Sequence, residues 1–169
     1  FGDLQLVSYA EGAWGRELEG VGKITFAMHT VSWNFLDVMG IEIVEGRDFF
    51  PSDEETITGA MIFNQTAQKK YGLTFESKMM GHVYGYNANI VGFCQDFNFY
   101  PAYREIEPFA FLLCGQYGWT MPRHTYIRTT AGADIAEVKK FIFDTCMEVA
   151  PYADPEKIKI EFFDYELEL

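Results

Sequence analysis

The sequence has few of the residues that most often carry chemistry. Its 169 residues include three cysteines and three histidines, without a Cys-x-x-Cys pair and without a second histidine or cysteine at ligand spacing. This argues against a zinc ribbon or a thioredoxin-type dithiol and predicts no metal site. Buried free thiols are the default prediction for the cysteines, although export of the chain would permit a disulfide between the first two. They are Cys94, Cys114 and Cys146.

Basic residues are also scarce. Lysine and arginine number 13 against 25 aspartate and glutamate residues, which gives a net charge of -12. A field of that sign repels polyanions and anionic lipid surfaces. We therefore predict that nucleic acid is not a partner.

Motifs of common enzymes are missing. No serine stands in a Gly-x-Ser-x-Gly elbow, and no glycine-rich loop precedes a helix in the manner of a phosphate site. The acidic run Asp53-Glu54-Glu55, with Asp48 nearby, lacks the spacing of a calcium loop and is better explained as a solvated loop. We predict no catalytic, cofactor or metal residues. The competing enzyme hypothesis places a convergent site at Asp96 and Glu107.

No apolar run reaches the roughly 18 residues that span a membrane, and no signal peptide is visible. The chain starts at Phe1 without methionine and stops within an alternating segment at Leu169. We expect a fragment of a longer protein, with residues 1–169 forming one domain.

What the sequence has in abundance is apolar and aromatic residues. Hydrophobic residues make up 49% and aromatic residues 17%, including 16 phenylalanines, which indicates a globular chain with a phenylalanine-rich core. An alternative is an exposed aromatic patch that binds a carbohydrate or another small ligand. Its candidate residues are Trp14, Tyr117, Trp119 and Tyr126.

Hydrophobic periodicity predicts an α+β fold of mostly antiparallel or mixed sheets, with about three helices packed on one face, as one body or two subdomains. Expected helices are Trp33–Met39 after a Ser32 cap, Gln65–Tyr71 after an Asn64 cap, and Ile135–Val149 after Asp134. Segments 11–20 and 51–58 are expected as loops. Expected strands are Leu4–Tyr9, Lys23–Val31, Ile41–Val44, Ala60–Phe63, Gly81–Tyr86, Asn89–Asp96, Phe109–Cys114, Thr125–Arg128 and Lys157–Phe163.

A series of short motifs from Val31 onward resembles one family. Glu45-Gly46-Arg47-Asp48-Phe49 is similar to its Gly-Arg-x-Phe turn, and the segment from Met61 through Asn64 to Ala67 is similar to its strand and capped helix. Met80-Gly81, Ile90-Val91-Gly92-Phe93 and Asp96-Phe97 follow in the family's order, and so does Ile106-Glu107-Pro108. In this order and spacing, the chain resembles the MacB-type periplasmic core domain of FtsX-like ABC transporter permeases.

The resemblance implies a non-catalytic extracytoplasmic domain, positioned between transmembrane helices of a bacterial inner-membrane protein. It implies a cytoplasmic ATPase subunit and a second permease protomer as partners. ATP-driven motion would then be transmitted to a lipoprotein, peptide or drug outside the membrane. Residues of the structural motif would be Gly46, Arg47, Phe49, Asn64, Gly81, Gly92, Asp96, Phe97 and Pro108.

Two of these residues have specific expected roles. Arg47 follows a strand and stands among acidic residues, so we predict a structural ion pair that holds a loop. Asp96 stands where a strand ends, so we predict that it bonds to backbone or to an arginine such as Arg47.

Overall fold

The computed structural model describes residues 14–56, 59–77, 79–80, 88–97, 105–113 and 125–161. The chain divides into two compact units, Phe1–Ile127 and Arg128–Leu169. Within the described ranges, no helix is long and apolar enough to cross a membrane.

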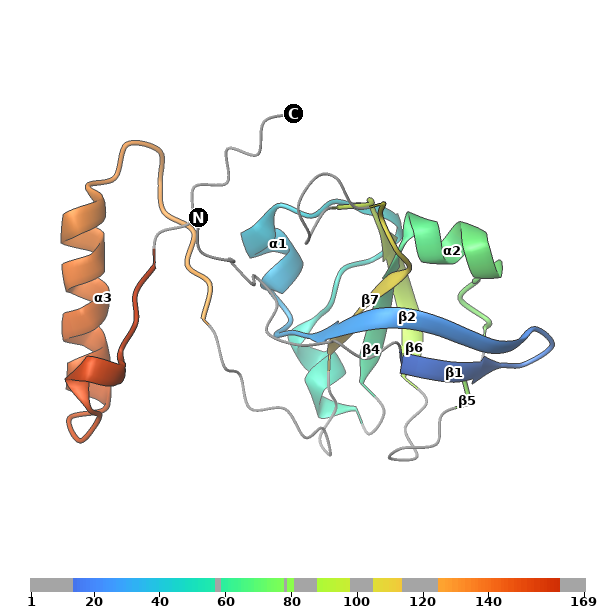
Figure 1. The fold of residues 1–169 in the computed structure, drawn as a ribbon, viewed down its shortest axis with the longest axis horizontal. Helices are drawn as coiled ribbons and strands as arrows, with labels where there is room; N and C mark the ends of the chain where they lie inside the picture. The colour runs from blue at the N-terminus through green and yellow to red at the C-terminus, as the bar shows by residue number, and fades with distance from the viewer. Residues whose placement is uncertain are drawn as a thin grey trace. The chain divides into compact units, whose positions relative to one another are not determined.

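The first unit is built on a mixed sheet (Figure 1). Seven described strands follow the order β3-β6-β4-β7-β2-β1-β5. The pairs β2–β7 and β4–β6 are parallel, whereas the other four pairings are antiparallel. This confirms the predicted α+β class. The strands are β1 Trp14–Leu18, β2 Gly22–Thr30, β3 Ile43–Gly46, β4 Ala60–Asn64, β5 Met79–Met80, β6 Asn89–Cys94 and β7 Phe109–Leu113.

Apolar side chains cover both faces of this sheet. Because successive residues of a strand point to opposite faces, Met61 and Phe63 of β4 join one buried cluster, and Ala60 and Ile62 join another. The first cluster also contains Ala67 of helix α2 (Gln65–Tyr71), and the second contains Leu36 of helix α1 (Phe35–Met39). The helices therefore cover opposite faces, and the expectation that they share one face is wrong. Central strands that are apolar on both sides need cover on both sides.

Local signals explain how these two helices begin and end. The Asn64 side chain accepts a hydrogen bond from the Ala67 amide, which confirms the predicted cap of α2. Gly72 and Gly40 end α2 and α1 in the left-handed conformation, at φ 61° and 69°. The predicted Ser32 cap of α1 is wrong. Asn34 occupies the cap position without a side-chain cap bond, and its Oδ1 accepts from the Ser32 hydroxyl at 3.1 Å.

The second unit contains helix α3 (Ile135–Val149), whose bounds confirm the prediction. Asp134 caps it by accepting from the amides of Ala136 and Glu137 at 2.8 and 3.1 Å. A short 3-10 helix follows at Pro155–Lys157.

Several other expectations are wrong. The expected loop 11–20 contains strand β1, which pairs antiparallel with β2, and the expected loop 51–58 contains a 3-10 helix, Pro51–Glu55. Neither segment 125–128 nor segment 158–161 forms a strand. Alternating hydrophobicity is a local signal, whereas a strand also needs a partner. The predicted strands at 4–9 and 81–86 lie outside the described residues.

Candidate functional site

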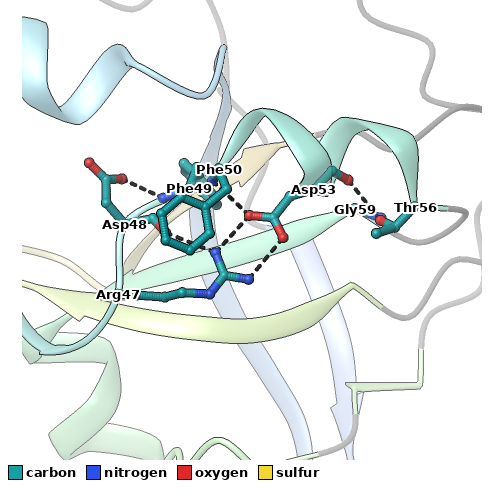
Figure 2. Close-up of polar contacts among 7 residues, drawn as sticks. All are labelled: Arg47, Asp48, Phe49, Phe50, Asp53, Thr56 and Gly59. Carbon is teal, nitrogen blue, oxygen red and sulfur yellow. Dashed lines mark hydrogen bonds and ion pairs between the residues drawn. The ribbon is translucent and has the colours of Figure 1, made fainter.

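An ion pair between Arg47 and Asp53 lies just after strand β3. Nη1 and Nη2 of Arg47 donate to Oδ2 and Oδ1 of Asp53 at 2.7 and 2.8 Å, in the bidentate geometry that strengthens such pairs (Figure 2). Nη1 also donates to the Asp48 carbonyl at 2.9 Å, and the guanidinium lies 4.6 Å from the centroid of the Phe50 ring. We call Arg47, Phe50 and Asp53 the Arg47 clamp. The structural ion pair predicted for Arg47 is therefore present.

Asp53 links the clamp to the next turn. Its Oδ2 accepts from the Phe50 amide at 2.8 Å, and its carbonyl accepts from the Thr56 hydroxyl at 2.7 Å. The Thr56 hydroxyl accepts in turn from the Gly59 amide at 2.9 Å, one residue before strand β4 (Figure 2). The clamp thus joins the end of β3 to the approach to β4.

The pKa values of the two carboxyl groups near the clamp, Asp53 and Asp48, shift in opposite directions. Hydrogen bonding from Arg47 holds the pKa of Asp53 below its usual value, against a smaller opposing effect of burial. Burial raises the pKa of Asp48, whose Oδ1 accepts from the Phe49 amide at 2.7 Å. Both carboxylates accept hydrogen bonds within the fold. In the acidic run that was predicted as a solvated loop, Asp53 is buried, whereas Glu54 and Glu55 are exposed.

Two glycines let the backbone of this region approach strand β6. A Cβ on Gly92 would collide with the carbonyl oxygen of Arg47. A Cβ on Gly46 would lie 2.5 Å from the carbonyl oxygen of Val91 in β6, and Gly46 has a φ of 79°. The predicted role of Gly92 in close backbone packing is confirmed.

A second set of polar contacts meets at Asn64, the last residue of β4, which is only 1% exposed. Its Oδ1 accepts from the Ala67 amide at 3.0 Å and from the Phe109 amide at 2.9 Å. Its Nδ2 donates to the Glu107 carbonyl at 3.0 Å. One side chain therefore joins β4, the first turn of α2 and the start of β7.

Asp96, two residues after the end of strand β6, binds the first turn of helix α2 at the same junction. Its Oδ1 accepts from the Thr66 amide at 2.8 Å, and its Oδ2 accepts from the Thr66 hydroxyl at 2.9 Å. The predicted bond from Asp96 to backbone is present, but its predicted alternative partner, Arg47, is instead bound to Asp53. We call Asn64, Thr66 and Asp96 the Asn64 junction.

The apolar motif residues pack around these polar contacts. Phe49 is buried in the cluster that contains α1. Phe97 stacks on Phe111 with ring centroids 5.2 Å apart and meets Phe109 edge-on at 5.4 Å. Pro108 is buried, and its carbonyl accepts from the Ala27 amide of β2 at 3.0 Å. Gly81 lies outside the described residues.

The sequence predicted the motif residues Arg47 and Asp96 but not their partners, Asp53 and Thr66. Asp53 stands six positions after Arg47, within the acidic segment that follows Arg47 in the sequence. Thr66 lies 30 positions from Asp96, and no local pattern connects them.

Tyr126, proposed for ligand binding, and Asp96 and Glu107, proposed for catalysis, make contacts within the fold. Tyr126 is half-buried against Phe35, with ring centroids 5.4 Å apart, and burial raises its pKa. The Asp96 carboxylate is bound to Thr66, and the Glu107 carbonyl is bound to Asn64. The side chains of Trp14, Tyr117 and Trp119 lie outside the described residues. In the described part of the chain, no group of three His, Cys, Asp or Glu side chains could hold a metal ion.

Cys94 is a free thiol with no exposed surface, and burial raises its pKa to about 12. Cys146 is also free, in the second unit, and partly exposed. The prediction of a buried free thiol is confirmed for Cys94, whereas Cys114 lies outside the described residues.

The fold is similar to those of two solved protein domains. A crystal structure of a domain from a Porphyromonas gingivalis protein assigned as a permease aligns over 82% of this chain and 69% of its own, with a TM-score of 0.56 and 17% identity. The periplasmic region of MacB from Actinobacillus actinomycetemcomitans aligns over 80% of this chain and 63% of its own, with a TM-score of 0.54 and 11% identity. The chain therefore has the fold of MacB-type periplasmic domains, as the motifs predicted. No protein-family model matches the sequence, and no curated protein matches it.

Proposed function

We propose that this chain is the extracytoplasmic domain of an ABC transporter permease and that it has no catalytic role. The observation that carries the proposal is the likeness of fold, over about four-fifths of the chain, to a permease domain and to the MacB periplasmic region. The ordered run of sequence motifs from Val31 to Pro108 supports it independently, because the motifs belong to the sequence and do not depend on the fold comparison.

The task we assign to the domain is to transmit motion. ATP binding and hydrolysis by a cytoplasmic ATPase subunit would move transmembrane helices, and this domain would carry the movement to a lipoprotein, peptide or drug. A second permease protomer would be its partner in the membrane. These partners follow from the family resemblance.

The internal contacts of the first unit suit a body that transmits force without yielding. The Arg47 clamp joins β3 to the approach to β4, and the Asn64 junction joins β4, α2, β6 and β7. Charge-assisted hydrogen bonds are stronger than neutral ones, and satisfied buried networks are rigid. A stiff domain is needed if a movement of the transmembrane helices is to reach a substrate outside the membrane.

The first test looks for apolar segments in the complete reading frame, and the second measures where the expressed protein is located. The frame should encode an apolar segment of about 20 residues close to each side of this domain. The protein should then sediment with membranes, and protease added to spheroplasts should cleave within residues 1–169 while a cytoplasmic control protein stays intact. A product without apolar segments that remains in the soluble fraction would overturn the proposal.

Motion is tested separately in the reconstituted transporter. In a Cys146→Ser background, which removes a partly exposed free thiol, spin labels on a cysteine introduced at exposed Glu54 (Glu54→Cys) would report the distance between protomers with and without ATP. We expect the distance distribution to change with ATP. In a control whose ATPase subunit cannot bind nucleotide, we expect no change. Identical distributions in the active transporter would remove the transmission role while leaving the membrane location untouched.

A further inference from the structure

We draw no further inference here: the strongest candidate, the apolar side of helix α3 in the second unit, none of whose residues is buried, carries nothing because nothing in the structure shows what covers it.

Discussion

Replacing Asn64 by alanine tests whether the Asn64 junction holds the first unit together. The substitution removes three hydrogen bonds from a side chain that is 1% exposed. Loss of a helix cap costs about 1 kcal/mol. The buried Phe109 amide would also lose its partner, at a cost of about 1–3 kcal/mol. We therefore expect the free energy of unfolding to fall by about 3 kcal/mol, and the melting temperature to fall by about 10 °C.

The chain offers a matched control and a selective probe. Asn34 occupies the cap position of α1 but makes no side-chain cap bond and is exposed, so Asn34→Ala should cost no more than about 0.5 kcal/mol. All three tryptophans, Trp14, Trp33 and Trp119, belong to the first unit, so tryptophan fluorescence during urea unfolding reports on that unit. If the two variants lose the same stability, the junction does not have the role argued for it.

Four further outcomes are expected. Asp96→Ala should lower the free energy of unfolding by about 2 kcal/mol in urea, because both bonds to helix α2 are lost, and an unchanged melting temperature would contradict this. Arg47→Met should destabilise the first unit at pH 7. Since Arg47 lowers the folded pKa of Asp53, its stabilising effect is present above the unfolded pKa of about 3.9 and is lost as pH falls through the folded value. Wild type and variant should therefore converge in acid melts, and a constant difference down to pH 2 would refute the assignment. Gly92→Ala should prevent soluble expression or lower the melting temperature sharply, because its Cβ has no space beside the backbone of Arg47, and a variant as stable as wild type would contradict that close approach. Cys94 should resist iodoacetamide at pH 8 in the native protein and react after denaturation, as judged by peptide mass spectrometry; rapid native labelling would show that the thiol is accessible.

Local patterns predicted the elements whose determining contacts span a few residues. Helix α3 begins after Asp134 and ends at Val149 as expected, because its cap and its apolar spacing lie within the segment itself. The Asn64 cap of α2 and its last residue, Tyr71, were predicted for the same reason. The motif residues Arg47 and Asp96 were also identified from the sequence, with an ion pair expected for Arg47.

Contacts between distant residues could not be predicted in this way. The segment around Trp14–Leu18 was expected as a loop because it is rich in glycine, yet pairing with β2 makes it a strand. Segments 125–128 and 158–161 alternate as strands do, but no described strand pairs with them. Pairing depends on which partner the folded chain brings alongside, and a short window of sequence does not contain that information.

The sequence by itself determined the α+β class, the capped helices α2 and α3, the buried free thiol of Cys94 and the resemblance to MacB-type periplasmic domains. Only the tertiary structure decided which residues the motifs bind. In the folded chain Arg47 binds Asp53, and Asp96 binds Thr66. The Asn64 side chain also bonds to Glu107 and Phe109, which lie 43 and 45 positions away in the sequence. The physical reason is that a cap bond forms within one helical turn, whereas a bond between strands forms only when the whole sheet has assembled.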